Sequence, residues 1–494
     1  MATGYSQSRA LLIAAIWTLF AGIGFCFILS VCGLTVRGGL LVAIAASLML
    51  PLAMRHANGS LDLFEPLVTA NFVLAVMFVG RPLGDLITGE TIHLGYDVLP
   101  TFDEALLVAL VGVGAFQLGY WPRVGRTLAR RWPKPPAFNP RLARFAAWGY
   151  VGLGAALFSL FLATQGGIGL LVALMRGRGG TDNDNLVFLS STGYFYNGIL
   201  LFSAAALVFF ALAILTRRRR YFLEFAATAL VTLFFFGSRG DRSQALPLLM
   251  AVPTFWYLWR DRRPRARTVV LVLLAGLLVS GWQRETRTAD TASRTALTDS
   301  LIDAISAPVS SIGDTLTGAD AEMFDTLANF LLVVPEAVPF EPGLTVRDVL
   351  LRAVPRPLWP DKPGEGGTAV FEILWPGRLD QSRAAAASSI LGSLYLDSGL
   401  LSVALGMFLI GALSSALWAW SRRHERSAIA QMIYAMGLPF VVILMRGNIQ
   451  GTLARMLFLL VPLVLLLWLT RFRFGPKSQR LRYRLQLNGG SKSK

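Results

Sequence analysis

The sequence predicts an all-α protein that crosses a membrane about twelve times and holds one long hydrophilic loop on the non-cytoplasmic side. Of the 494 residues, 54% are hydrophobic and 15% are charged, whereas a soluble domain carries about 25% charged residues. The apolar residues form blocks, and a helix of about 20 apolar residues spans the hydrocarbon core of a bilayer. These blocks lack the apolar–polar alternation of transmembrane barrel strands, so we expect helices.

The first apolar block, residues 10–32, is longer than the apolar core of a signal peptide, so we expect a helix that stays in the membrane. Eleven further helices are expected near residues 38–55, 66–81, 103–121, 142–165, 193–216, 219–237, 243–260, 267–283, 388–421, 428–446 and 450–471. The chain therefore divides into residues 1–283 with nine helices, a loop over 284–387, three helices in 388–471 and a basic tail over 472–494.

The charge of the connectors predicts the orientation. When the N-terminus is placed in the cytoplasm, the strongly basic connectors all fall on the cytoplasmic side: Arg123, Arg126, Arg130, Arg131 and Lys134; Arg217 to Arg220; Arg260, Arg262, Arg263, Arg265 and Arg267; Arg422, Arg423 and Arg426; and the tail from Arg471 to Lys494. The short outer connectors hold Asp85, Glu90, Asp97, Asp103, Glu104, Asp182 and Asp184. Inserted membrane proteins show this asymmetry, so we expect both termini in the cytoplasm.

The net charge of +17 arises largely from these basic segments. It therefore indicates orientation and contact with anionic membrane lipid. No basic patch accompanies a soluble fold, so we expect no nucleic-acid partner. The two cysteines, Cys26 and Cys32, lie in the first apolar block, and the three histidines match no metal-binding spacing. We therefore expect no disulfide framework, no metal and no cofactor.

The loop over residues 284–387 is far longer than an ordinary connection. Apolar residues recur in it at helical spacing, as in Leu297, Leu301 and Ile305, and again in Met323, Leu327, Phe330 and Val334. This spacing predicts amphipathic helices that lie on the membrane face. A further short helix is expected over 344–354, ended by Pro355. The proline-rich residues 355–363 are expected to be stiff and extended.

The predicted helix interiors hold almost no ionisable residues. Glu224 is the main exception, and we expect it to pair with Arg220 one turn away, near the cytoplasmic interface. Ion-coupled transporters place carboxylates or basic residues at mid-membrane depth. The scarcity of such residues argues against proton-coupled transport.

The outer connectors hold arginines, although the positive-inside bias disfavours arginine there. Arg239 and Arg242 lie in the connector Phe236-Gly237-Ser238-Arg239-Gly240-Asp241-Arg242, where a helix begins. Arginine makes forked hydrogen bonds to phosphate oxygens, and a helix N-terminus adds free N–H groups. Arg446, with Arg455 one turn into the next helix, forms a second such connector. Arg284, at the exit of the ninth helix, belongs to a third outer site, and Arg176 and Arg178 lie in a fourth, glycine-rich one. If they converge, they form a cationic site for a diphosphate; the alternative is surface ion pairs such as Arg239 with Asp241.

A general base is harder to assign from the residues. The candidate outer carboxylates are Asp314, Glu336, Asp361 and Asp397, and the one outer histidine is His93. Asp361 lies beside Lys362 in the proline-rich stretch, and Asp397 lies where the tenth helix is expected to begin. Asp361 or Asp397 could take a proton from a sugar hydroxyl. Each could equally be a helix cap or a solvated surface charge.

Four features resemble the oligosaccharide repeat-unit polymerases, the O-antigen polymerase family of the Wzy type. They are the Gly-Ser-Arg-Gly connector at 237–240, the long late outer loop, the Pro-Arg-x-x-Trp-Pro-x-Lys-Pro element at 355–363 and the glycine-rich helix at 392–411. The resemblance covers chiefly residues 231–460. The chain departs from the family pattern at 396–399, where it reads Leu-Asp-Ser-Gly.

The resemblance implies a GT-C-like membrane fold of the polymerase and ligase type, in the bacterial inner membrane with its active site on the periplasmic face. It implies polymerisation of undecaprenyl-diphosphate-linked oligosaccharide units without a metal, for O-antigen, capsule or exopolysaccharide. A chain-length regulator and a flippase would be expected partners. The residues expected to hold the diphosphates are Arg239, Arg242 and Arg446, to which we add Arg284, Arg356 and Lys362.

Three alternatives stay open at this point. An O-antigen ligase would use the same donor with a different acceptor, but such ligases are expected to use a histidine in the large outer loop, and residues 284–387 contain none. A polysaccharide transporter would need a polar central path. A structural subunit of an export complex is the third alternative.

Overall fold

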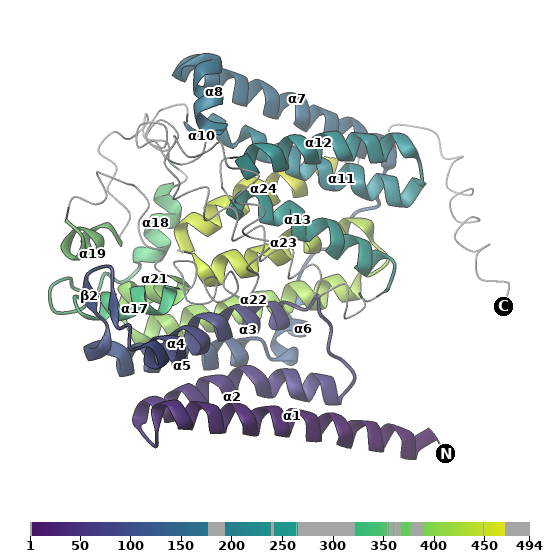
Figure 1. Cartoon of the computed structure of the whole chain (residues 1–494). Coiled ribbons are helices and arrows are strands. Elements are labelled where there is room, and N and C mark those ends of the chain that lie inside the picture. Colours follow the sequence, from purple (N-terminus) through teal and green to yellow (C-terminus); the bar gives the residue numbers. More distant parts are fainter. Residues whose placement is uncertain are drawn as a thin grey trace, which may run out of the picture.

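The computed structural model describes residues 2–175, 193–238, 242–262, 264, 322–352, 354, 359, 367–376, 389–447 and 449–469. Long antiparallel helices make up most of it, and they run roughly along one common axis (Figure 1). The expected ninth helix at 267–283 lies outside the described residues, and so do Leu297, Leu301 and Ile305 and the tail 472–494.

The first part of the chain holds α1 (Ala2–Cys32) and α2 (Val36–Ala57), followed by α3 (Pro66–Ala75), a π-helical turn η1 (Val76–Gly80) and α4 (Arg81–Thr88). Strands β1 (Ile92–His93) and β2 (Tyr96–Asp97) form a small antiparallel hairpin, and the 3₁₀ turn η2 (Leu99–Thr101) leads into α5 (Phe102–Gly119). Next come α6 (Pro122–Arg130), α7 (Pro140–Gln165) and α8 (Gly167–Met175).

The second part holds α10 (Gly193–Tyr196), η3 (Asn197–Ile199), α11 (Leu200–Thr216), α12 (Arg219–Ser238) and α13 (Arg242–Trp259). The described parts of the large loop form α17 (Met323–Leu331), α18 (Leu344–Arg352) and α19 (Gly367–Leu374). The chain returns through α21 (Ser389–Ser398) and α22 (Leu400–Arg423), and it then forms α23 (Ala428–Arg446) and α24 (Ile449–Leu469).

Among the described residues, nine helical spans are long and apolar enough to cross a membrane. They include the continuous span from Pro66 to Thr88, which joins α3, η1 and α4. The prediction of an all-α polytopic membrane protein is therefore confirmed. The count of twelve and the GT-C-like fold stay predictions.

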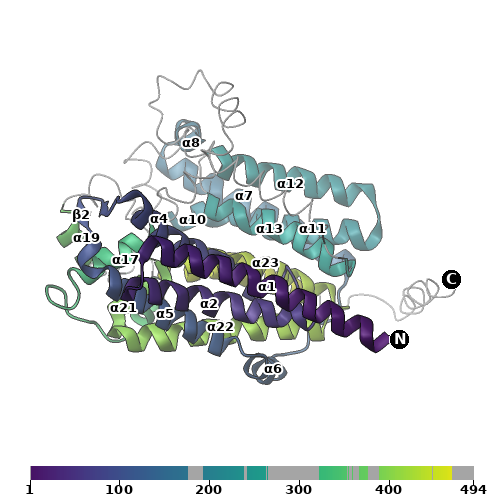
Figure 2. The same ribbon diagram turned by 60° about the horizontal axis from the view of Figure 1, so that its bottom comes forward.

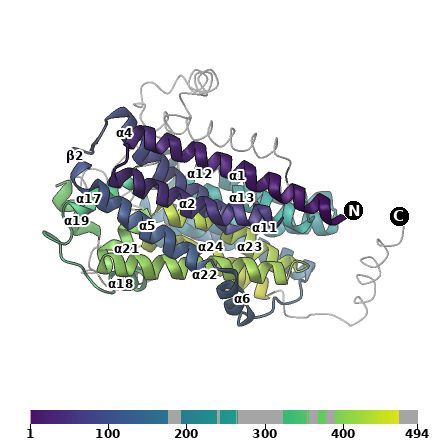
Figure 3. The same cartoon turned by 90° about the horizontal axis from the view of Figure 1, so that it is seen from below.

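The connectors between the helices lie at two opposite ends of the bundle. The basic connectors around α6, between α11 and α12, after α13 and between α22 and α23 lie at one end, which we call the basic end (Figure 1). The hairpin, α17 and α19 lie at the opposite end, which we call the loop end (Figures 1 and 3). The structure thus separates the connectors as the charge pattern predicts.

Two hydrophobic cores meet at α23. One core joins α2, α3, α5, α21 and α22 with the loop helix α17, and it includes Val441 and Met445 of α23. The other core joins α7, α11, α12, α13 and α24, and it includes Met432 and Met436 of α23. The described loop helix α17 is therefore part of the first core.

Glycines allow α5 and α22 to approach closely. A Cβ atom at Gly119 would lie 2.0 Å from the Phe408 carbonyl oxygen, and one at Gly411 would lie 2.3 Å from the Phe116 carbonyl oxygen. No side chain fits at such distances, so these two helices pack backbone to backbone there. Such small-residue packing is typical of membrane helices, which gain little hydrophobic free energy from contact with one another in lipid.

The structure corrects several expected boundaries. The block expected at 66–81 continues to Thr88, and the block expected at 388–421 is two helices separated at Gly399. Gly399 has φ +64°, a left-handed value that glycine adopts without strain. The helices α6 and α19 and the hairpin were not expected, whereas α18 confirms the short helix predicted to begin at Leu344.

Three expectations about amphipathic, polar and charged residues were wrong. All residues of α17 are buried, so this helix is a core element and does not lie on the membrane face. Glu224 pairs with Arg144 of α7, whose Nε donates to Glu224 Oε1 at 2.9 Å, whereas Arg220 donates to the Tyr221 hydroxyl. The expectation that charged residues are almost absent from the helix interiors also fails, as the loop end shows.

Candidate functional site

A cluster of four charged or titratable side chains lies buried at the loop end. Arg81 and Asp85 come from α4, His93 from β1 and Asp325 from α17. Their exposed fractions are 5%, 2%, 8% and 1% respectively. Charged side chains are almost never buried to this extent unless they are paired, so these four residues, which we call the buried cluster, are the main candidate site in the described part of the chain.

Local structure explains how these side chains meet. Arg81 and Asp85 are four residues apart on α4 and therefore lie on one face. The preceding π-helical turn adds a residue per turn, a feature that often occurs at functional sites. The hairpin turns at Leu94 and Gly95, both with positive φ, as a tight two-residue turn requires. This turn leaves Ile92 exposed and turns His93 inward.

Arg81 contacts all three other members of the cluster. Its Nε atom donates to Asp325 Oδ2 at 2.8 Å and lies 3.3 Å from Asp85 Oδ1. Its Nη2 atom lies 2.9 Å from His93 Nδ1 and 3.0 Å from His93 Nε2. His93 Nε2 also lies 3.5 Å from Asp85 Oδ1 and 3.4 Å from Asp325 Oδ1. One guanidinium group therefore forms ion pairs with two carboxylates that belong to different parts of the chain.

Burial changes the acid–base properties of the cluster. Burial, followed by the nearby charge of Asp85, raises the pKa of Asp325 to about 7. Burial acts to lower the pKa of His93, but its hydrogen bond to Asp85 and the charge of Asp325 outweigh this effect, so the net shift is upward. Titratable groups with perturbed pKa values concentrate at functional sites.

The same region ties the large loop to the hairpin and to α5. Asn329 of α17 donates to the His93 carbonyl oxygen at 3.4 Å, and the Thr101 hydroxyl donates to the Ala328 carbonyl oxygen at 2.8 Å. On the other side of the hairpin, Tyr96 donates to the Leu374 carbonyl oxygen at 2.6 Å, and Trp375 donates to the Leu94 carbonyl oxygen at 2.9 Å. The hairpin thus forms hydrogen bonds with α17 on one side and with the end of α19 on the other.

Three members of the cluster have the atom types of metal ligands. One ligand atom from each of Asp85, His93 and Asp325 lies within 4.8 Å of the others. The Arg81 guanidinium group lies among these same atoms and already supplies a positive charge to them. The donor set therefore suits Arg81 better than a divalent cation, which the arginine would repel.

Most of the predicted diphosphate-binding residues lie outside the described residues: Arg239, Arg284, Arg356, Lys362 and the candidate base Asp361. The candidates Arg176, Arg178 and Asp314 lie outside them as well. Arg242 begins α13, although its side chain is not among those described. Arg446 ends α23 and is half-buried. The two helices pack along each other, so both positions lie at the loop end.

Asp397 anchors the loop to the bundle. Its Oδ1 atom accepts a hydrogen bond of 2.8 Å from the backbone N–H of Thr345 in the first turn of α18. A carboxylate at a helix N-terminus stabilises free N–H groups and the positive end of the helix dipole. Burial raises the pKa of Asp397 above its usual value, although the hydrogen bonds from Thr345 and Leu344 act in the opposite direction. The capping role, one of the two open alternatives, is thus the one that the described contacts favour.

Substituting Asp397 by asparagine distinguishes a cap from a catalytic base. Asparagine keeps an oxygen that can accept from Thr345, and it caps helices as well as aspartate does, but it cannot take up a proton. We expect Asp397→Asn to retain thermal stability and any glycosyl transfer of the kind that the family resemblance implies, and Asp397→Ala to lose about 0.5–2 kcal/mol of stability. Product formation and melting temperature, measured on both purified variants, check this. Loss of activity in a stable Asp397→Asn protein would restore the base assignment.

A second buried polar group lies at the basic end. Glu65, which is fully buried, accepts from Arg55 at 2.5 Å and from the Tyr120 hydroxyl at 3.1 Å through the same oxygen, Oε1. Burial raises the pKa of Glu65 to about 7, although the charge of Arg55 acts to lower it. The nearby Tyr434 hydroxyl donates to the Phe64 carbonyl oxygen. These contacts hold the connector between α2 and α3 against the end of α5 and against α23.

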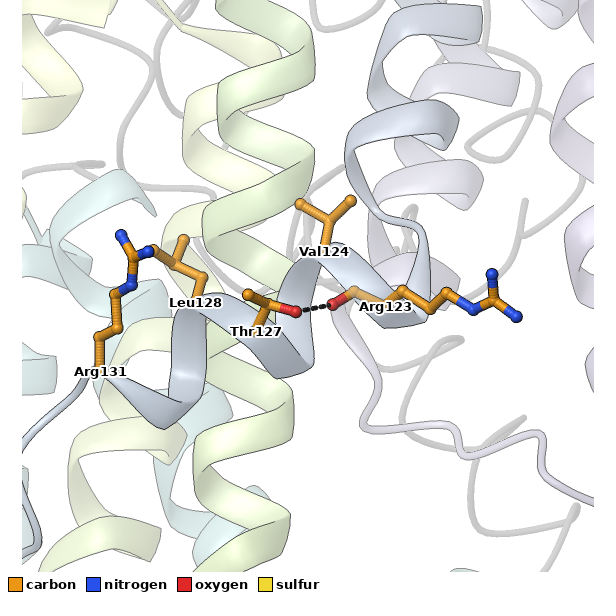
Figure 4. Close-up of a pocket in the computed structure, with 5 residues that line it drawn as sticks. All are labelled: Arg123, Val124, Thr127, Leu128 and Arg131. Atoms are coloured by element: carbon orange, nitrogen blue, oxygen red, sulfur yellow. Dashed lines mark hydrogen bonds between the residues drawn. The ribbon is translucent and has the colours of Figure 1, made fainter.

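A shallow open depression lies on α6, also at the basic end (Figure 4). Figure 2 shows α6 at the edge of the bundle, below α22, against which it packs. Arg123, Thr127 and Arg131 line the depression at four-residue spacing, and the Thr127 hydroxyl donates to the Arg123 carbonyl oxygen at 2.8 Å. The two arginine side chains point to opposite sides in Figure 4. This arrangement suits a basic helix at the membrane surface rather than a site where polar groups converge on one ligand.

Sequence reasoning missed the buried cluster. The charge pattern places Asp85 among the outer connector charges, and the helical spacing of Met323 and Leu327 indicates only the apolar face of the segment that forms α17. A signal was nevertheless present, because Asp325 and Asn329 share one face of this otherwise apolar segment. Polar residues on such a face need partners when buried.

No family model, no curated protein and no solved structure matches this chain.

Proposed function

We propose that the protein is a metal-independent glycosyltransferase of the bacterial inner membrane that polymerises undecaprenyl-diphosphate-linked oligosaccharide units. The loop end would face the periplasm, because the basic end carries the charge expected on the cytoplasmic side. The product would be O-antigen, capsule or exopolysaccharide. A chain-length regulator and a flippase would work beside it.

The observation that supports this proposal best is the arrangement of three helix ends. Arg446 ends α23, and both α13, which begins at Arg242, and α24, which begins at Ile449, pack against α23. Two helix N-termini therefore lie at the loop end with arginine positions beside them. Helix N-termini and arginines both favour phosphate groups, and the polar head of a lipid diphosphate would lie at this depth of the membrane.

The proposed reaction needs little beyond positioning and positive charge. The hydroxyl oxygen of the acceptor sugar attacks the anomeric carbon of the donor, and the bond to the diphosphate oxygen breaks. Negative charge develops on the departing diphosphate, which arginines stabilise. The hydroxyl proton passes to a base, for which Asp361 remains the sequence-predicted candidate, while Asp397 is engaged with Thr345.

Gene deletion tests the proposal against its rivals. Loss of a polymerase should leave single repeat units on the lipid carrier, and sizing of the carrier-linked glycans detects this directly. Loss of a ligase would instead leave long chains on the carrier, and loss of a flippase would leave units on the cytoplasmic face. Normal chain lengths after deletion would exclude polymerisation, and complementation with the intact gene is the control.

Ion-coupled transport is the second candidate, because the buried cluster places ionisable groups at one end of a membrane span. A proton path along α3 would need polar groups along its length. Asn71 donates to the Leu48 carbonyl oxygen and accepts from Gln117, but Leu74, Met77 and Phe78 separate it from Arg81, and all three are buried among apolar residues. At 1.5 Å per residue this gap is about 15 Å, so the polymerase remains the better supported proposal.

A further inference from the structure

We infer that the buried cluster binds one proton when the loop helix α17 is docked, and that the docking of this helix therefore weakens as the pH at the loop end rises. The inference rests on the charges and contacts of Arg81, Asp85, His93 and Asp325. It does not depend on the reaction that the protein catalyses.

Counting charges gives the first argument. The cluster contains two carboxylates, one guanidinium and one imidazole, and each residue is more than nine-tenths buried. With His93 neutral and both carboxylates ionised, the net charge is one negative unit. An uncompensated buried charge costs a large free energy, and a buried group avoids this cost by changing its protonation state. One added proton makes the buried cluster neutral.

Hydrogen bonding gives a second, independent argument. Among the described residues, Asp85 Oδ2 and Asp325 Oδ1 lack a hydrogen-bond donor although both are buried. Nearly all buried polar atoms in folded proteins have a partner. A proton on one carboxyl group can be donated to the other, whereas a proton on His93 would set its ring N–H groups against Arg81 Nη2, which lies 2.9 Å from Nδ1 and 3.0 Å from Nε2. The added proton thus supplies the donor that these oxygens lack.

Other titratable groups around α17 have partners of their own. From α5, Asp103 pairs with Arg37 at 2.6 Å, and Glu104 accepts from Tyr395 of α21 at 3.3 Å. Asp397 of α21 caps α18. Glu322, which precedes α17, lies outside the cluster and is half-buried. Within the described part of the chain, Arg81 and His93 both contact Asp85 and Asp325, so the four cluster members form one connected set of contacts.

The buried cluster takes up this proton when α17 docks and releases it when α17 separates. Asp325 is the cluster member carried by α17, and the other three belong to the bundle and the hairpin. When α17 separates from α4, Asp325 enters water and regains an ordinary carboxyl pKa. The docked state has the higher pKa for Asp325 and for His93, so it holds more protons. Docking is thus strongest in acid and weakens progressively until the pH passes about 7.

Hydrogen exchange of the full chain in lipid nanodiscs tests the inference. Protection factors of the α17 amides, corrected for the intrinsic effect of pH on exchange, report the undocking equilibrium. Release of one proton predicts a fall of up to about tenfold per pH unit between roughly pH 5 and pH 7. The amides of α11, which lies in the other core, should show no such slope. A slope of zero in the unmodified protein would overturn the inference without any variant.

Asp325→Asn should abolish the slope, because the cluster is then neutral with no added proton while the side chain keeps an oxygen for Arg81. Glu322→Gln is the matched control, since it removes a carboxylate beside the same helix but outside the cluster, and it should keep the full slope. If Asp325→Asn retains the slope of the unmodified protein, the proton is bound elsewhere and the inference is wrong. Should that variant fail to fold, Asp85→Asn makes the same charge change on α4 and is expected to give the same flat profile.

Discussion

Replacing Arg81 by alanine should lower the stability of the protein by about 3–5 kcal/mol, the cost of breaking a buried ion pair by removing one partner. Among the described residues, the Arg81 guanidinium group contacts both carboxylates, at 3.3 Å from Asp85 and 2.8 Å from Asp325. Without it, two carboxylates that are at most 2% exposed face each other. The expected local result is separation of α17 from α4.

Melting temperature and chemical unfolding in detergent or nanodiscs measure this loss. Arg37→Ala is the matched control, because Arg37 also pairs with an aspartate at the loop end, but the side chains of that pair are 30% and 48% exposed. Exposed pairs contribute about 0–1 kcal/mol, so the control should unfold almost like the unmodified protein. Equal losses of stability in the two variants would show that the buried Arg81 pairs stabilise the protein no more than the Arg37–Asp103 pair does.

Arg81→Lys refines the same test. Lysine keeps the positive charge but offers a compact ammonium group, which cannot reproduce the planar set of donors that reaches both His93 and Asp325. We therefore expect an intermediate stability. A lysine variant as stable as the unmodified protein would mean that charge alone, and not the forked geometry, holds the cluster together.

Sequence periodicity predicted most membrane helices because the bilayer imposes length and apolarity on each one separately. Charge bias predicted the separation of the connectors for a similar reason, since orientation depends on the count of Lys and Arg in short connectors. Both signals are local, and both can be read from a single chain without knowing which helix contacts which. The bounds of α2, α7 and α12 accordingly differ little from the predicted ones.

The buried cluster could not be predicted in this way, because it depends on contacts between distant residues. Arg81 and Asp325 are 244 positions apart, and the polar face formed by Asp325 and Asn329 does not indicate which distant residues would pair with it. The apolar spacing of α17 is equally consistent with a helix on the membrane surface and with one under a hairpin. Only the fold decides between them, and it also converts Asp85 from an apparent surface charge into a buried one.

For Asp397 the local sequence is compatible with more than one role. A carboxylate near the start of an expected helix can serve as a cap or as a base, and the residue types around it do not separate the roles. The hydrogen bond from Thr345 comes from a helix more than 40 residues earlier in the chain, so it is visible only in three dimensions.

Arg446 offers the most direct test of the proposed chemistry among the described residues. If Arg446 holds the diphosphate, its substitution by alanine removes hydrogen bonds to a charged group, which contribute about 1.5–3 kcal/mol. This corresponds to a rate of polymerisation about 10-fold to more than 100-fold lower. Arg446→Lys should also be impaired, because a point charge cannot make the forked contact to phosphate oxygens.

The rate should be measured with purified protein in nanodiscs and a lipid-diphosphate-linked repeat unit as substrate. A loss confined to KM would indicate that Arg446 binds the donor equally in the ground state and the transition state, whereas a loss in kcat would indicate stabilisation of the departing diphosphate. Arg423→Ala is the control, since Arg423 is an exposed arginine in the last turn of α22, at the opposite end of the bundle. It should polymerise normally. Full activity of a well-folded Arg446→Ala protein would remove Arg446 from the diphosphate site, and the proposal would then have to rest on arginines of the other loop-end connectors.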